Sequence, residues 1–403
     1  MSAADRSLDE VVGRLLERVG RRLVVGLPLG LGKPNRLVNA LYRRACADSS
    51  IRLEIVTALS LDPPTASHWL EARLMEPIVE RLVGEDYPRL DYVADLERGR
   101  VPGNVSVTEF YFQSGGALGN AEMQRRYVSS NYTHVARDLV DRGVNVVMQL
   151  VAADERGRLS LACNPDVTLD LVRRAGEVGH ELFTVGHVHP DLPFMHGDAV
   201  VERGFFDVVV EEDPRQVLFP VPRQPVSLQD HAVGFNAARL VADGGTLQIG
   251  IGSLSDALVN ALVLRHEHPD DHARLAEALD ASVPPGIGSD EPFEQGIYGA
   301  SEMFMDGFMH LYNAGVLKRE VFDDLTVMRR INAGMSVDGA GEGAVMDGGF
   351  FLGSRPFYAF LNGLDETQRP RFRMHGVGRI NQLYGGREAL EIEQRRHARF
   401  VNT

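Results

Sequence analysis

The feature that most constrains the fold is a repeated alternation of short β-branched runs with stretches of helical periodicity. Near-continuous apolar runs are typical of strands buried on both faces, and helices between them supply the crossovers that parallel strands require. We therefore predict an α/β protein with mainly parallel sheets. The predicted strands lie at residues 23–27, 52–58, 144–151, 181–185, 208–210 and 246–249.

The chain has 403 residues, more than a single hydrophobic core usually supports, so more than one domain is expected. A proline-rich connector, FPVPRQPVS at residues 219–227, interrupts both periodicities and precedes a new helical pattern and a new strand. We place the boundary there, which gives domains at residues 1–218 and 219–403. Residues 68–137 are rich in charged and aromatic side chains, and we interpret them as a helical insertion in the first domain or a long elaboration of it.

Composition excludes several classes of function. Lys and Arg number 42 against 56 Asp and Glu, a net charge of −14, so sequence-independent binding of nucleic acid is not expected. Cys46 and Cys163 lie in no disulfide or metal-finger pattern, which favours a reducing compartment. No run is long and apolar enough to span a membrane, and the amphipathic N-terminus lacks the apolar core of a secretory signal, so we expect a cytoplasmic protein.

A glycine turn at Gly250, Ile251 and Gly252 follows the predicted strand TLQIGI and precedes a helical pattern. Backbone N–H groups at such a turn can bind an anion or a developing oxyanion. The pattern GIGSLSDA matches neither of the common nucleotide-binding glycine motifs. From the pattern alone, a binding site and an ordinary tight turn are equally good interpretations.

The segment GIYGASEMFMDGFMHLYNAGVL holds two carboxylates, Glu302 and Asp306. Their spacing places them on one face if the segment is helical. Among the surrounding Met and Phe side chains a carboxyl group would have a raised pKa and could act as nucleophile or general base. The alternative is that Glu302 only caps a following helix whose core stripe includes Phe304, Phe308 and Leu311.

His187, His189 and His196, together with Asp198, raise the competing hypothesis of a metal site. Alternate residues of a strand project on one face and can share an ion. No other histidine lies at a spacing that completes a ligand set, so we expect these side chains to serve the fold.

Taken together, six ordered segments resemble those of the acetyl-CoA hydrolase/transferase family, which includes 4-hydroxybutyrate and succinate:acetate CoA-transferases. The resemblance implies two CoA-transferase-like α/β domains of the NagB/RpiA-like type with mainly parallel sheets. The six segments are VVMQLVAADERGRLSLACNPD, PFMHGDAVVERGFFDVVVE, GGTLQIGIGSLSDALVNAL, SEMFMDGFMHLYNAGVL, GGFFLGSRPFYAFL and VGRINQLYGG.

The resemblance also implies the chemistry. Glu302, within SEMFMDG, corresponds to the glutamate that attacks an acyl-CoA thioester and becomes first an acyl anhydride and then a glutamyl-CoA thioester. A second small carboxylic acid, of the acetate type, reverses these steps, or water hydrolyses the adduct. The oxyanion-binding amide falls on Ile251, between Gly250 and Gly252, and an asparagine near the thioester oxygen falls on Asn381. Coenzyme A is then a co-substrate, and no metal or resident cofactor is expected. The resemblance also implies that the protein forms a homodimer.

Family members carry a GxGG-type motif beyond the segment that contains Asn381, and no such motif precedes Thr403. The second domain is therefore expected to be truncated. Two hypotheses follow from this difference. The first is a CoA-transferase or acetyl-CoA hydrolase, and the second is a truncated, non-catalytic protein that binds CoA or depends on a partner chain.

Overall fold

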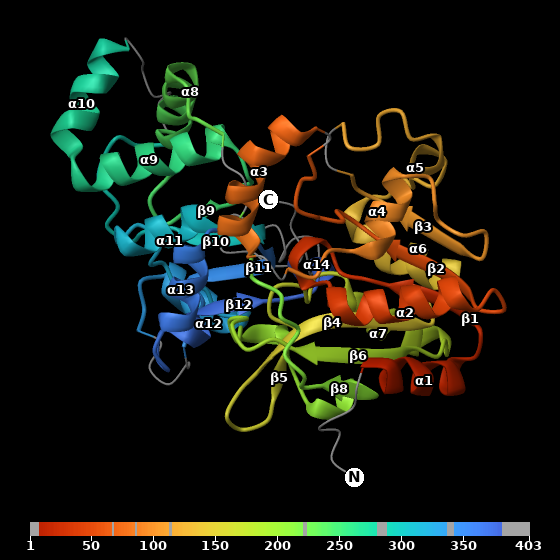
Figure 1. Ribbon diagram of the computed structural model, residues 1–403. Helices are drawn as coiled ribbons and strands as arrows, with labels where there is room; N and C mark the ends of the chain where they lie inside the picture. The colour runs from red at the N-terminus through yellow and green to blue at the C-terminus, as the bar shows by residue number, and fades with distance from the viewer. Residues whose placement is uncertain are drawn as a thin grey trace. The chain divides into compact units, whose positions relative to one another are not determined.

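The computed structural model describes residues 8–66, 68–84, 87–112, 115–220, 224–279, 288–336 and 342–380. The chain divides into two compact units (Figure 1). Unit 1 consists of Met1–Phe194 and Ala199–Phe219, and unit 2 of Met195–Asp198 and Pro220–Thr403. Each unit is built on its own mainly parallel sheet covered by helices, so the predicted α/β class is confirmed.

Unit 1 contains an eight-stranded sheet whose parallel strands follow the order β3-β2-β1-β4-β6-β8. Two short antiparallel strands, β5 and β7, extend from the end of β4. The strands are β1 (Arg22–Gly26), β2 (Arg52–Thr57), β3 (Val105–Glu109), β4 (Val146–Ala153), β5 (Leu159–Ser160), β6 (Phe183–Val188), β7 (Val200–Val201) and β8 (Val208–Val210). The helices are α1 (Leu8–Val19), α2 (Asn35–Ala47), α3 (Trp69–Val83), α4 (Asp91–Glu97), α5 (Ala121–Arg125), α6 (Val135–Arg142) and α7 (Thr168–Val178).

Alternate residues of the central strands enter two separate cores. Leu23 and Val25 of β1 pack with α1, α2 and α4, whereas Val24 packs with α6 and α7. A strand that buries both faces needs apolar residues at successive positions, which is why these strands read as continuous apolar runs.

The expected helical insertion at residues 68–137 is wrong in part. Val105–Glu109 forms strand β3, which pairs in parallel with β2 and belongs to the main sheet. Tyr92 and Leu96 of α4 are buried in the same core as β1 and β2. The strand escaped prediction because VSVTE is short and has polar residues at three of its five positions.

The loop after β1 is held in place by a buried lysine. The Nζ atom of Lys33 donates hydrogen bonds to the carbonyl oxygens of Ala58 and Leu59, at 2.7 and 3.2 Å. Burial lowers the pKa of Lys33 to about 7. The side chain therefore joins the loops that follow β1 and β2.

Unit 2 contains a four-stranded parallel sheet in the order β12-β11-β10-β9. The strands are β9 (Thr246–Leu247), β10 (Tyr298–Phe304), β11 (Met346–Phe351) and β12 (Phe372–Met374). The helices are α8 (Leu228–Ala238), α9 (Ser253–Glu267), α10 (Pro269–Ala278), α11 (Asp306–Asn313), α12 (Leu325–Asn332), α13 (Arg355–Gly363) and α14 (Val377–Ile380). Among the helices that the structure describes in both units, none is long and apolar enough to cross a membrane.

Aromatic rings fill the space between this sheet and its helices. The ring of Phe304 lies 5.0 Å from that of Phe357, 5.7 Å from Phe372 and 6.1 Å from Phe308. The predicted core positions Phe304, Phe308 and Leu311 are fully buried. The packing thus fixes α11 and α13 to the strands that precede them.

Helices α8 and α9 pack so closely that a glycine is required between them. A Cβ atom at Gly234 would lie 2.6 Å from the carbonyl carbon of Ala257 and 2.7 Å from the nitrogen of Leu258. We predict that Gly234→Ala lowers the free energy of unfolding by about 1–3 kcal/mol, because the helices must separate. Urea denaturation measures this change.

Gly176→Ala is the matched control, because Gly176 is also helical and a Cβ there meets no atom within 4 Å. Its stability should be unchanged or higher by about 0.5–1 kcal/mol. Equal effects of the two substitutions would contradict the close contact at Gly234.

Candidate active site at the carboxyl edge of unit 2

The candidate site lies near the carboxyl edge of the sheet, where β9 has ended and β10 continues to Phe304. Beyond the last residues that pair β9 with β10, the hydroxyl of Ser301 donates a hydrogen bond of 3.1 Å to the carbonyl oxygen of Ile249. Glu302 follows Ser301, and Gly250 follows Ile249. Because the two chains run parallel here, Glu302 and Gly250 lie at the same level of the sheet. Ligands of α/β proteins usually bind at this edge, beyond the carboxyl ends of the strands. The structure thus brings together Glu302 and the glycine turn.

Glu302 is a partly buried carboxylate without a partner. Among the residues that the structure describes, no hydrogen bond or ion pair reaches its side chain. Burial raises the pKa of this carboxyl group. A carboxylate that is neither paired nor fully solvated is a better nucleophile than one in water, and perturbed pKa values of this kind are common at active sites.

The expected helical face shared by Glu302 and Asp306 is wrong. Glu302 belongs to strand β10, and Asp306 is the first residue of α11. The alternative, that Glu302 caps the helix, is also wrong, because Met305 occupies the N-cap position. The segment is a strand because it pairs with β9 and β11 on both sides, and this tertiary pairing overrides the local pattern.

Asp306 fixes the turn that follows β10. Its buried carboxylate accepts a hydrogen bond of 3.0 Å from the backbone N–H of Ser354 and another from the Ser354 hydroxyl. Ser354 in turn caps α13, since its Oγ accepts from the N–H of Phe357 over 3.3 Å. The neighbouring Gly353 has no room for a side chain, because a Cβ would lie 2.9 Å from Oδ2 of Asp306. Asp306 therefore joins the loops after β10 and β11.

The glycine turn is open above the sheet. Ile251 is 44% exposed, and a Cβ at Gly250 or Gly252 would meet no atom within 4 Å. Gly252 is the N-cap of α9 with φ 142°, a conformation that favours glycine. On the other side of β10, Gly349 allows β11 to approach, since a Cβ there would lie 3.1 Å from the carbonyl oxygen of Glu302. Asn381 lies outside the described residues, so its role stays a prediction.

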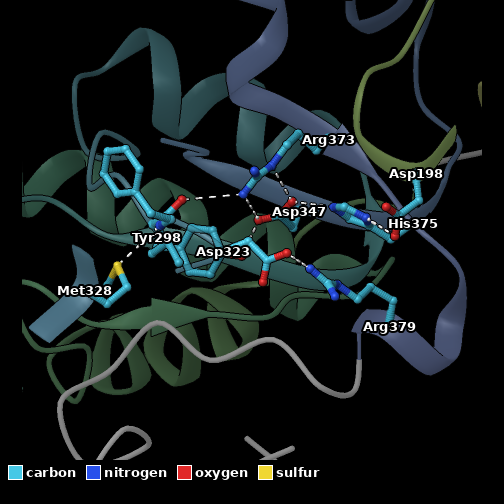
Figure 2. Close-up of polar contacts among 10 residues, drawn as sticks. Asp198, Tyr298, Asp323, Met328, Asp347, Arg373, His375 and Arg379 are labelled. Atoms are coloured by element: carbon cyan, nitrogen blue, oxygen red, sulfur yellow. Dashed lines mark hydrogen bonds and ion pairs between the residues drawn. The ribbon is translucent and has the colours of Figure 1, made fainter. Parts of the chain in front are cut away.

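A buried ion network lies in the same sheet (Figure 2). Asp347 of β11 is fully buried and accepts four contacts, from Nε and Nη2 of Arg373 at 3.0 and 3.2 Å, from Nε2 of His375 at 2.7 Å and from the hydroxyl of Tyr298 at 2.5 Å. The other ring nitrogen of His375 contacts Oδ2 of Asp198 at 2.8 Å. These residues tie β10, β11 and the chain after β12 to one another.

The network shifts the pKa values of its members. Burial alone would lower the pKa of His375, but the hydrogen bonds that its ring donates to Asp198 and Asp347 outweigh burial and raise the pKa to about 9. The pKa of Asp347 is lowered in spite of burial, through its contacts with His375 and Arg373. His375, Arg373 and Asp347 are therefore charged at neutral pH, and the two positive side chains lie in contact with the negative one.

Sequence reasoning missed Asp347, Arg373 and His375. The available signal was one charged residue, Asp347, inside the apolar run AVMDGGFF, together with the polar residues Arg373 and His375 in the short segment FRMHG. Buried charges of this kind need partners. The partners could not be assigned because they lie on strands and segments far apart in the chain.

The histidines of the metal hypothesis contact the backbone instead. Nε2 of His187 lies 2.6 Å from the carbonyl oxygen of Glu212, and Nε2 of His189 contacts the carbonyl oxygen of Gln216. Burial lowers both pKa values, that of His187 to about 4. No group of three potential metal ligands is found among the described residues. His187 and His189 belong to unit 1, whereas Glu302 belongs to unit 2.

Comparison with curated proteins finds similar CoA transferases. The chain is 23% identical over 228 residues to succinyl-CoA:cyclohexane-1-carboxylate CoA transferase of Geobacter metallireducens, which covers 57% of this chain and 39% of that protein. It is 27% identical over 176 residues to 4-hydroxybutyrate coenzyme A transferase of Clostridium kluyveri, covering 43% and 32%. Over part of its length the chain is thus similar to CoA transferases. Its matches span about a third of the length of these curated relatives.

Solved structures share the fold of this chain. The crystal structure of RipA from Yersinia pestis superposes with a TM-score of 0.59 at 17% identity, covering 94% of this chain and 69% of that one. A 4-hydroxybutyrate CoA-transferase from Porphyromonas gingivalis gives a TM-score of 0.52 at 18% identity, covering 94% and 68%. No protein-family model matches the chain.

The two hydrogen bonds that Ser354 donates to Asp306 lead to a prediction about stability. We expect Asp306→Asn to lower the free energy of unfolding by about 1–3 kcal/mol, because an amide cannot accept both hydrogen bonds from Ser354. Ser354→Ala should cost a similar amount, and the double variant should cost clearly less than the sum of the two. Urea denaturation of the four proteins measures the coupling. Additive effects would show that the two side chains do not act together.

Proposed function

We propose that the chain transfers CoA between an acyl-CoA and a small carboxylic acid through a covalent adduct on Glu302. One observation carries the proposal: a carboxylate with a raised pKa and no partner among the described residues lies two residues before the end of β10, level with the glycine turn that follows β9. The similarity to CoA transferases supplies the substrate class. Coenzyme A is then a co-substrate, and no step requires a metal.

The reaction proceeds in two displacements. The Glu302 carboxylate attacks the thioester carbonyl, the CoA thiolate leaves, and an acyl-glutamyl anhydride forms. The thiolate then attacks the glutamyl carbonyl, which releases the first carboxylate and leaves a glutamyl-CoA thioester. A second carboxylate attacks this thioester, and the returning thiolate takes the new acyl group and frees Glu302. The anhydride and thioester are both close in energy to the reactants, so neither accumulates irreversibly.

The glycine turn is suited to stabilise the charge that develops on the carbonyl oxygen. We assign the N–H of Ile251, between Gly250 and Gly252, to the oxyanion, and Asn381 to the thioester oxygen. Preorganised N–H donors of this type lower the barrier because they need no rearrangement during the reaction.

Hydrolysis of acyl-CoA shares these steps and differs in the last one. If water instead of a carboxylate reaches the glutamyl-CoA thioester, the product is free CoA and regenerated Glu302. Transfer and hydrolysis are separated by measuring both products with and without an acceptor such as acetate. The homodimeric state and the cytoplasmic location inferred from the sequence stay predictions.

Replacement of the nucleophile tests the proposal. With acetyl-CoA and propionate as substrates, Glu302→Gln should reduce formation of propionyl-CoA by roughly a thousandfold or more. The variant should melt at or above the temperature of the wild-type protein at neutral pH, because an ionised, partly buried carboxylate without partners destabilises the fold. Chromatography of the CoA esters and a thermal melt provide the two measurements.

The matched control is Glu294→Gln, which changes an exposed glutamate of unit 2. This variant should retain wild-type transfer. Wild-type activity in Glu302→Gln would rule out the proposed nucleophile.

The pH dependence follows from the raised pKa of Glu302. Only the ionised carboxylate attacks, so kcat/KM should fall on acidification with a midpoint above 4.5, the ordinary value for a glutamate. Circular dichroism at each pH separates this loss from unfolding. A folded protein whose kcat/KM stays constant down to pH 4.5 would contradict the assignment.

A further inference from the structure

His375 makes contact with a carboxylate at each of its ring nitrogens. Nδ1 lies 2.8 Å from Oδ2 of Asp198, and Nε2 lies 2.7 Å from Oδ1 of Asp347. An ionised carboxylate can only accept hydrogen bonds, and a neutral imidazole has a single N–H. Two such contacts therefore require the doubly protonated, positively charged ring.

The two carboxylates are held very differently. Asp347 is fully buried and keeps contacts from Arg373 and from the hydroxyl of Tyr298, whatever the state of the histidine. The side chain of Asp198 is 51% exposed and can turn toward water. When the ring loses a proton, Asp198 is thus the partner that is lost. Arg379 of α14, which also acts on Asp198, is paired with Asp323.

Asp198 belongs to a short segment, Met195–Asp198, that we call the strap. The strap is part of unit 2, whereas the chain on both sides of it belongs to unit 1. The carbonyl oxygen of His196 accepts a hydrogen bond of 2.8 Å from the N–H of Met374. Gly197 has φ 83° and lies so close that a Cβ would be 2.9 Å from both Cβ of Arg373 and the carbonyl oxygen of Met374.

We propose that His375 is a proton-dependent latch that holds the strap on the chain at β12 and releases it when the ring becomes neutral. The inference is independent of the chemistry proposed for Glu302. It assigns a function to the HGD segment, in which His196 supplies a carbonyl, Gly197 the close approach and Asp198 the charge.

The direction of the pH effect follows from the raised pKa. The ordinary pKa of the ring is 6.5, and in the docked strap it is about 9. Proton binding therefore stabilises the docked strap fully below pH 6.5, and this contribution is lost progressively as the pH rises to about 9. One linked proton changes the docking equilibrium by up to about tenfold per pH unit within this window.

Hydrogen exchange measured by mass spectrometry tests the latch in the full chain without substrate. The observable is the protection of the Met374 amide, which donates to the strap, after correction for the pH dependence of the intrinsic exchange rate. In the wild-type protein, protection should fall by up to about tenfold per pH unit between pH 6.5 and 9. In His375→Gln, protection should be lower at pH 6.5 by roughly ten- to a hundredfold and constant across the window.

His231→Gln, which changes an exposed histidine of α8, is the matched control and should follow the wild-type curve. Asp198→Asn tests the same latch if His375→Gln fails to fold. Without the charge at position 198 the pKa of His375 falls, so protection should stop declining at a pH clearly below 9. Wild-type protection that does not change from pH 6.5 to 9, or an Asp198→Asn curve identical to wild type, would overturn the proposal.

Discussion

Parallel pairing of β9, β10 and β11 is the constraint on which the candidate site depends. In a parallel sheet every strand ends at the same edge, so residues that follow different strands meet there although they are distant in sequence. Ser301 and Ile249 show this directly, since their hydrogen bond places Glu302 level with Gly250. The hydrogen bonds from Ser354 to Asp306 then fix the loops after β10 and β11 at that edge. The positions of Glu302 and of the glycine turn are thus consequences of strand register.

Asp347 and Glu302 belong to the same sheet, but their surroundings give the two carboxyl groups different properties. Asp347 is completely buried, yet its contacts with His375 and Arg373 keep its pKa low. Glu302 is less buried but has no partner among the described residues, and burial raises its pKa. The first carboxylate is therefore fixed and saturated with donors, whereas the second is available to attack a substrate. Such divergence between neighbouring carboxyl groups is typical of sites that combine structural and catalytic acids.

Features that depend on local sequence patterns could be predicted from the sequence, whereas features that depend on contacts between distant positions could not. The fold class was predictable because two-sided burial leaves a local trace, the continuous apolar run. The glycine turn and Glu302 were each identified, but their proximity depends on the register of β9 and β10, which no local pattern encodes. β10 was not predicted as a strand, because its Met and Phe residues suit either period. The contact of Asp198 with His375 joins positions 177 residues apart, and only the folded chain reveals it.

The central claim, a covalent CoA adduct on Glu302, is tested most directly by peptide mass mapping after chemical trapping. The purified chain is incubated with acetyl-CoA, treated with hydroxylamine or borohydride, and digested. The account predicts a modification on the peptide that contains Glu302, located at that side chain, and absent when acetyl-CoA is omitted or Glu302→Gln is used. Transfer activity without any modification at Glu302, or a modification on another carboxylate, would contradict it.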